Sequence, residues 1–297
     1  MIKTGLICFT FTLASAFPAA AKSLPDIYTS LFILGDSLSD NGTTAPVGSV
    51  SSNGPVWNDP LLEQFEVAGK TSVNLASGGA TAAGTSAIDL AAQVAQFQNF
   101  AAPKGDRPLV SLWFGGNDLL PDDPINAPFA NFTLANAQAA AFAIDAQVDV
   151  LIGDGVSDFL IFGLPDLGKI PLTSTAPPAL QQQASLLSSA FDATLQAILP
   201  TDVNITFIDI FSLTGATVAD PASFGFSTLF PCTLSPLVDC ADTPFWDPIH
   251  PTSAAHAIIG AEVRAALEPV PLPAGAWLLL TGLAAVGGLR RRKAIAS

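Results

Sequence analysis

The stretch "FILGDSLSDNG", residues 32–42, decides the fold class, because the apolar run 31–34 leads directly into Gly35, Asp36 and Ser37. A continuous apolar run that ends at glycine and polar residues is typical of a strand covered on both faces and followed by a loop. Ser37 is therefore predicted to stand just beyond the carboxyl end of a buried strand.

Four further runs have the same character, and longer segments rich in Ala, Gln and Leu separate them. The predicted strands are 31–35, 71–76, 108–115, 158–164 and 204–210. The predicted helices are 58–68, 86–100, 131–153, 177–199 and 253–267. Strand and helix alternate, which favours an α/β fold with a doubly wound, mostly parallel five-stranded sheet in a three-layer α/β/α sandwich. In such a sheet, ligands bind beyond the carboxyl ends of the strands, where Ser37 is expected.

Composition limits the function classes. The chain has 297 residues, of which 49% are hydrophobic and 12% are charged, so it can bury a sizeable core. Eleven Lys and Arg stand against 25 Asp and Glu. This negative balance repels polyanions, so nucleic acid is excluded as a partner.

The N-terminal segment 1–21 is predicted to be a signal peptide. Lys3 precedes an apolar stretch, and Ala19 and Ala21 supply the small residues of a cleavage site. A buried N-terminal helix is the alternative. Cleavage after Ala21 would leave one domain at 22–269, in which no internal repeat or linker is visible.

The C-terminal segment 270–297 combines a short proline motif, an apolar span at 274–289 and the basic run 290–293. The positive charges are expected to stay cytoplasmic, which leaves the preceding domain outside. This tail resembles a PEP-CTERM sorting signal of the Val-Pro-Leu-Pro-Ala form. The resemblance implies transient membrane association and cleavage by an exosortase-type processing enzyme. A periplasmic, cell-surface or extracellular location follows, with a plain C-terminal anchor as the alternative.

Cysteine usage agrees with export. Cys8 lies in the predicted signal peptide, and Cys232 and Cys240 remain in "PCTLSPLVDC". An oxidising compartment favours a disulfide between them, and two reduced cysteines are the alternative. The spacings of metal-binding cysteines and histidines are absent.

A serine nucleophile needs a base, and the chain has two histidines. His250 lies in "FWDPIHPT", three residues after Asp247, and prolines on either side restrict this loop. His256 lies in "SAAHAIIG" on the last predicted helix, where a structural role is favoured. We therefore expect His250 to be the base and Asp247 to orient it.

Attack on a carbonyl also needs donors for the developing oxyanion. "NLASGGAT" places Gly78 and Gly79 after the second predicted strand, and "WFGGND" places Asn117 after the third. A glycine lets a backbone N–H approach a ligand closely, and an Asn side chain is a neutral donor. Each motif alone is an ordinary turn signal. Together with the motifs of Ser37 and His250, they supply a nucleophile, a base, an orienting acid and oxyanion donors.

In these four motifs the sequence resembles the GDSL family of SGNH hydrolases. "GDSLSDNG", "NLASGGAT", "GGND" and "DPIHPT" match its blocks in order over residues 30–268. The resemblance implies an SGNH-hydrolase, flavodoxin-like fold. By resemblance, Ser37 is the nucleophile and an oxyanion donor, Gly79 and Asn117 are further donors, and Asp247 and His250 complete the triad. Pro248 departs from the family, where glycine is common.

The implied reaction is hydrolysis of a carboxylic ester through an acyl-enzyme, without a cofactor. The expected substrate is a small-molecule or lipid ester, and lipid, aryl and carbohydrate esters all stay open. Asp36 and Asp40 flank Ser37, but acidic turn residues need no ion, so no metal site is predicted. An acyltransferase that uses the same residues and a catalytically silent surface or matrix protein are the alternatives.

Overall fold

The computed structural model describes residues 22–43, 51–120 and 129–268. The predicted signal peptide and sorting signal, with the span at 274–289, lie outside the described residues. Residues Ser23–Leu267 form one compact unit.

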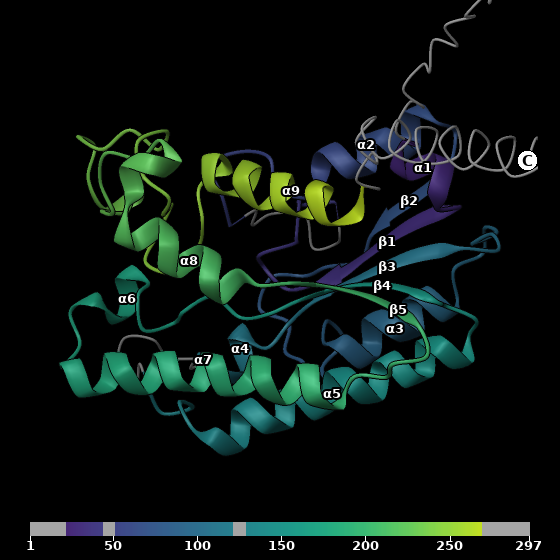
Figure 1. The fold of residues 1–297 in the computed structure, drawn as a ribbon, viewed down its shortest axis with the longest axis horizontal. Coiled ribbons are helices and arrows are strands. Elements are labelled where there is room, and N and C mark those ends of the chain that lie inside the picture. The colour runs from purple at the N-terminus through teal and green to yellow at the C-terminus, as the bar shows by residue number, and fades with distance from the viewer. Residues whose placement is uncertain (1–21, 44–50, 121–128, 269–297) are drawn as a thin grey trace, which may run out of the picture. The chain divides into compact units, whose positions relative to one another are not determined.

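A five-stranded parallel sheet forms the centre of this unit (Figure 1). Its spatial order is β2-β1-β3-β4-β5, and every neighbouring pair is parallel. The strands are β1 (Ser30–Gly35), β2 (Thr71–Asn74), β3 (Pro108–Trp113), β4 (Asp158–Phe162) and β5 (Asn204–Ile208). The predicted α/β class and parallel sheet are confirmed.

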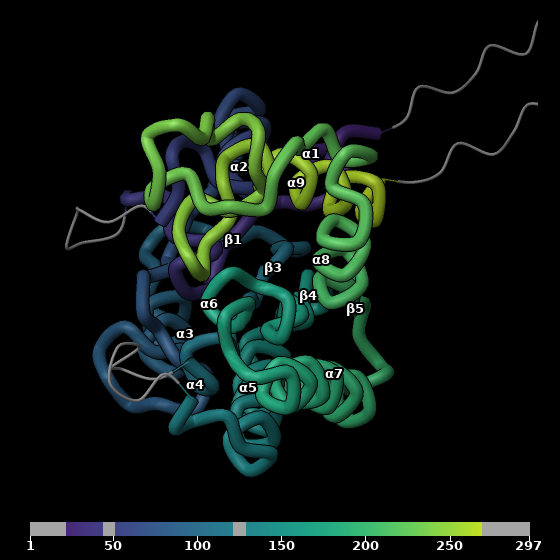
Figure 2. Tube along the Cα trace, turned by 90° about the vertical axis from the view of Figure 1, so that its left-hand side faces the viewer, coloured from purple at the N-terminus to yellow at the C-terminus, as the bar shows by residue number. Residues whose placement is uncertain are grey.

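Helices cover both faces of the sheet and bury two apolar clusters against it. The larger cluster lies beneath α3 (Leu90–Gln98), α5 (Leu134–Gly153) and α7 (Pro178–Ile198). The other cluster lies beneath α1 (Leu24–Ile27), α2 (Asp59–Val67) and α9 (Ser253–Leu267). Figures 1 and 2 show these two groups of helices on opposite sides of the strands. The predicted three layers are therefore present.

Two expectations from the sequence were wrong in detail. The edge strands β2 and β5 are only partly buried, whereas two-sided cover was predicted for all five strands. An additional helix, α8 (Ile210–Ala219), follows β5, where no helix before residue 253 was predicted. The Asp209 side chain caps it by accepting from Ser212 N at 2.8 Å, which offsets the low helix propensity of its Thr and Gly residues.

Short elements complete the edge of the sheet at which the strands end. They are α4 (Gly116–Leu119), α6 (Pro171–Ser174) and the 3₁₀ turns η1 (Pro221–Phe224) and η2 (Cys232–Leu234). Because all five strands run in the same direction, the loops that follow them gather at this edge. The motifs singled out in the sequence follow β1, β2 and β3 or precede α9.

Candidate active site

Ser37 lies in a tight turn directly after β1. The carbonyl of Asp36 accepts from Ser39 N at 3.0 Å and from Asp40 N at 2.9 Å, and its carboxylate accepts from Leu38 N at 2.9 Å. A Cβ on Gly35 would come within 2.8 Å of the Ser39 Cβ, so this close approach needs a glycine. The turn thus holds Ser37 at the strand end, with 7% of the residue exposed.

The structure brings Ser37, His250 and Asp247 into one hydrogen-bonded chain. Ser37 Oγ lies 2.9 Å from His250 Nε2, and His250 Nδ1 lies 2.8 Å from Asp247 Oδ2. His250 lies 213 residues further along the chain than Ser37. Serine, imidazole and carboxylate in this order are the arrangement in which a base can activate a hydroxyl.

The loop that carries His250 is tied down at several points. Asp247 Oδ1 accepts from Ile249 N at 2.8 Å and from His250 N at 2.7 Å, and Trp246 N donates to His250 O at 2.9 Å. Pro248 stands where the family commonly has glycine. Its carbonyl accepts from Leu172 N at 2.9 Å. The carboxylate of Asp247 therefore fixes both the backbone and the ring of the candidate base.

The charge state of Asp247 follows from these contacts. Burial opposes its charged form, but the hydrogen bonds from the His250 ring and backbone and from Ile249 N outweigh burial and hold its pKa below the ordinary value. A carboxylate that stays ionised at neutral pH can stabilise a positive charge on the neighbouring ring.

On the other side of Ser37, the two glycines of "NLASGGAT" differ in their hydrogen bonding. Gly78 N donates to Asp40 Oδ2 at 2.9 Å, so this N–H is already engaged. Gly79 has φ of +81°, and a Cβ there would meet no atom within 4 Å. The space beside Gly79 is therefore open, as a backbone donor to a ligand requires.

The side chain of Asn117 approaches the same loop. Its Nδ2 donates to Ala80 O at 2.9 Å, which orients the amide group from the first turn of α4. The primary amide carries a second N–H, so one bond to Ala80 fixes the side chain and leaves donor capacity for a ligand.

Sequence reasoning missed Asp118. Its two carboxylate oxygens accept from Ala82 N at 2.8 Å and from Ala83 N at 2.9 Å, so it clamps the loop that carries Gly79. Burial raises the pKa of Asp118, although the N–H groups of Ala82 and Ala83 oppose that shift. An acidic residue next to a candidate oxyanion donor, with a glycine-rich loop elsewhere in the chain, is the sequence signal that could have pointed to it.

A model of the GDSL-like lipase/acylhydrolase family matches residues 31–263. The chain belongs to this family. It is thus a hydrolase of the GDSL lipase/esterase group, and the family resemblance of its four motifs is confirmed.

Several proteins are similar to this family member. A phosphatidylcholine-sterol acyltransferase from Aeromonas hydrophila is 25% identical, over 89% of this chain and 95% of that protein. Esterase EstA from Pseudomonas aeruginosa is 28% identical over 83% of this chain and 48% of the esterase, so the chain spans about half of that relative. The solved extracellular lipase from Streptomyces rimosus superposes with a TM-score of 0.45 and 16% identity, over 80% of this chain and 99% of the lipase.

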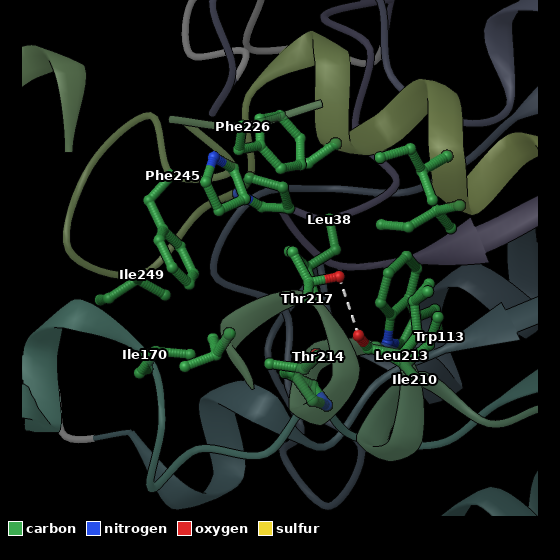
Figure 3. A pocket seen from close by; sticks show the side chains of 17 residues that line it. Leu38, Trp113, Ile170, Ile210, Leu213, Thr214, Thr217, Phe226, Phe245 and Ile249 are labelled. Carbon is green, nitrogen blue, oxygen red and sulfur yellow. Dashed lines mark hydrogen bonds between the residues drawn. The ribbon is translucent and has the colours of Figure 1, made fainter. Parts of the chain in front are cut away.

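Figure 3 shows an apolar pocket of this GDSL hydrolase. Leu38, which follows Ser37, and Ile249, which precedes His250, both line it. Ser37, Asp247 and His250 do not, so the pocket adjoins the two loops rather than the reacting side chains. Other lining residues are Trp113, Ile170, Ile210, Leu213, Thr217, Phe226, Phe245 and Ile259.

His256, the other histidine, is buried in α9 and stands outside the hydrogen-bonded chain. Neither ring nitrogen has a hydrogen-bond partner among the described residues. Burial, together with the nearby His250, lowers its pKa to about 3, which keeps the ring neutral at physiological pH.

Cys232 and Cys240 form a disulfide with an S–S distance of 2.05 Å, as predicted. Within ranges 22–43, 51–120 and 129–268, no group of three or more His, Cys, Asp or Glu side chains is arranged to hold a metal ion. In the same ranges no helix is long and apolar enough to cross a membrane.

Proposed function

We propose that this hydrolase is an exported lipase- or esterase-type enzyme that cleaves carboxylic esters through an acyl-enzyme. Ser37 is the nucleophile, His250 the base and Asp247 the orienting acid. The carrying observation is the pair of contacts from Ser37 Oγ to His250 Nε2 at 2.9 Å and from His250 Nδ1 to Asp247 Oδ2 at 2.8 Å. This arrangement passes a proton from hydroxyl to imidazole while the carboxylate stabilises the charged ring.

In the first half-reaction, Ser37 Oγ attacks the ester carbonyl carbon as His250 Nε2 takes the hydroxyl proton. The carbonyl oxygen becomes an oxyanion, to which the N–H groups of Ser37 and Gly79 and the amide of Asn117 donate. When the tetrahedral intermediate collapses, the bond to the alcohol oxygen breaks. His250 gives its proton to that oxygen, and the acyl group stays on Ser37.

In the second half-reaction, water replaces the alcohol. His250 takes a proton from the water as its oxygen attacks the acyl carbonyl, and the same three donors meet the second oxyanion. Collapse releases the carboxylic acid and returns the proton to Ser37. Each step uses groups of this chain, the ester and water.

Ser37→Ala tests the nucleophile. Turnover of p-nitrophenyl esters should fall to the background rate with little change in melting temperature, whereas Ser174→Ala, which removes an exposed hydroxyl bonded to Pro171 O, should leave both unchanged. A fluorophosphonate probe should add its mass to the peptide that contains Ser37 and to no other peptide. Wild-type turnover in Ser37→Ala would refute the assignment. Esters with acyl chains of different lengths, used as a panel, would define the substrate.

Acyl transfer to an alcohol is a second candidate, favoured by the similarity to the Aeromonas protein named as an acyltransferase. It uses the same acyl-enzyme, with an acceptor alcohol in place of water. Product analysis with and without an added alcohol separates the two, because a transferase forms a new ester at the expense of free acid. A catalytically silent surface protein would hydrolyse no ester, so the wild type and Ser37→Ala would both show only the background rate.

Export rests on the terminal segments and the disulfide. Residues 1–21 serve as the signal peptide, and the segment 270–297 serves as a sorting signal cut by an exosortase-type enzyme after transient membrane association through 274–289. The Cys232–Cys240 bond supports an oxidising location, periplasmic, cell-surface or extracellular. Intact-mass measurement of the protein from its host should give a chain that begins near Lys22 and lacks the basic run 290–293. A mass that includes 274–297 would favour a retained anchor.

A further inference from the structure

Three large apolar side chains are exposed within eight residues of the segment between η1 and α9. Phe230 is 49% exposed, Leu234 58% and Leu237 93%. We call these three side chains the apolar patch. Single exposed apolar residues are common on soluble proteins, whereas three of them within eight residues make this segment a candidate interaction surface.

The segment that carries the apolar patch is constrained. The disulfide closes residues 232–240, with 5.1 Å between the two Cα atoms. Within this loop, Leu234 N donates to Pro231 O and Val238 N donates to Ser235 O, both at 3.2 Å. In Figure 1 this part of the chain loops out at the upper left, beyond α8. A constrained loop can present apolar side chains without first losing conformational entropy.

The apolar patch is also joined to the candidate active site. Cys232 N donates to Phe245 O at 3.1 Å, and Thr233 N donates to Trp246 O at 3.0 Å. Trp246 directly precedes Asp247. Two backbone hydrogen bonds therefore hold the patch at a fixed distance from the loop of Asp247 and His250, so whatever binds the patch is brought near Ser37.

Charge identifies what the apolar patch can bind. No Lys or Arg occurs between Lys169 and Arg264, and Asp239 and Asp242 are exposed beside the patch. An anionic membrane attracts basic segments, so this acidic surface would be repelled by one. A zwitterionic or uncharged lipid surface accepts apolar side chains without that cost.

Size argues against a second copy of the chain as the occupant. A stable interface buries about 800 Å² on each partner. Three side chains, two of them leucines, fall well below that area, but they suffice for reversible insertion into a lipid surface, where every apolar group that enters adds to binding.

We propose that the apolar patch docks onto the surface of a zwitterionic or uncharged lipid aggregate, so that the enzyme takes its ester substrate from that surface. This inference rests on the proposed ester hydrolysis and names lipid esters as its substrate class. Docking adds no bond to the reaction. It raises the local concentration of ester at Ser37.

The test uses phosphatidylcholine vesicles and a chain of residues 22–268, which holds the compact unit and both apolar clusters. Cosedimentation gives vesicle affinity, and p-nitrophenyl acetate in vesicle-free solution gives turnover. The double variant Leu234→Ser/Leu237→Ser should bind at least about tenfold more weakly, because two apolar side chains no longer enter the lipid. Its kcat/KM for the soluble ester should stay within about twofold of the parent.

A matched control removes exposed apolar side chains elsewhere. Val67 in α2 is 83% exposed and Leu186 in α7 is 62% exposed. Val67→Ser/Leu186→Ser should leave vesicle affinity and soluble turnover unchanged. Vesicles that contain phosphatidylglycerol should bind the parent chain more weakly than phosphatidylcholine alone, and the difference should shrink as salt rises.

Several results would overturn the inference. One is a parent chain that does not sediment with phosphatidylcholine vesicles, and another is an equal loss of affinity in both double variants. Binding by the full chain but not by 22–268 would assign lipid contact to 269–297. A dimer of the parent that Leu234→Ser/Leu237→Ser dissociates would make a second copy the occupant. Absence of soluble-ester turnover in a parent that still binds vesicles would instead count against the proposed function.

Discussion

Replacing Asn117 by alanine separates transition-state stabilisation from substrate binding, because this donor comes from a side chain. The Asn117 amide is held by one bond from Nδ2 to Ala80 O at 2.9 Å. If the second N–H meets the oxyanion only as charge develops, Asn117→Ala should lower kcat by roughly 10²- to 10³-fold, about 2.7 to 4 kcal/mol, with little change in KM. Loss of the Ala80 bond should cost about 0.5–1.5 kcal/mol of folding stability in addition.

The assay measures kcat, KM and thermal unfolding on one preparation with a soluble p-nitrophenyl ester. Asn136→Ala is the control, because Asn136 Nδ2 donates to Asn131 O at 3.0 Å and so loses the same kind of bond near the start of α5. It should show the small stability loss without the fall in kcat. A loss of more than about 1 kcal/mol in Asn117→Ala, with kcat within a few-fold of wild type, would make Asn117 a turn residue only.

Three further changes test the surroundings of the site. Asp118→Asn should lower kcat by about tenfold or more, since the amide NH2 would replace one of the two oxygens that accept from Ala82 N and Ala83 N and would face an N–H instead. Unchanged kcat would show that the clamp does not position Gly79. Asp192 is a buried residue of α7, and its Oδ1 accepts from Leu164 N at 2.8 Å. Burial raises its pKa from 3.8 to about 7, so between these pH values the folded state binds a proton that the unfolded state releases, and stability should fall as pH rises. Asp192→Asn should remove up to about 4 kcal/mol of that dependence in denaturant titrations from pH 4 to 8, and a parallel pH dependence in both proteins would contradict it. Replacing both Cys232 and Cys240 by alanine should lower the unfolding free energy by about 2–3 kcal/mol, and dithiothreitol should reproduce the loss in the native protein.

Much of the fold could be predicted because buried strands carry a local signal. The central strands β1, β3 and β4 are buried at every position, and their uninterrupted apolar runs show in the sequence. The edge strands β2 and β5 are half-covered, so their tertiary neighbours rather than their own residues decide their exposure. Helix α8 was not predicted for a related reason. The side-chain cap at Asp209 contributes more to its stability than the intrinsic helix propensity of its residues does.

The candidate site likewise has a part that could be predicted from the sequence and a part that could not. Ser37, Asp247, His250, Gly79 and Asn117 could be proposed from short motifs, since each residue type has the chemistry that its role requires. Their catalytic roles stay predictions, although the first three form a hydrogen-bonded chain. The clamp of Asp118 on Ala82 and Ala83 joins segments more than 30 residues apart, so the position of Asp118 beside Asn117 could suggest a role but could not identify its partners.

Three carboxyl groups around the proposed oxyanion donors, Asp36, Asp40 and Asp118, each accept from backbone N–H groups of the loops at the strand ends. They order those loops, but negative charge near a developing oxyanion would oppose the reaction. Burial reduces that conflict. It raises the pKa of Asp36 to about 7, despite the bond from Leu38 N, and it raises the pKa of Asp118. A protonated Asp36 still accepts from Leu38 N through its carbonyl oxygen, so the turn after β1 stays fixed while the negative charge of this carboxyl group is reduced. Burial of Asp36 therefore serves two needs of the site, a fixed turn after β1 and a weaker negative field beside Ser37.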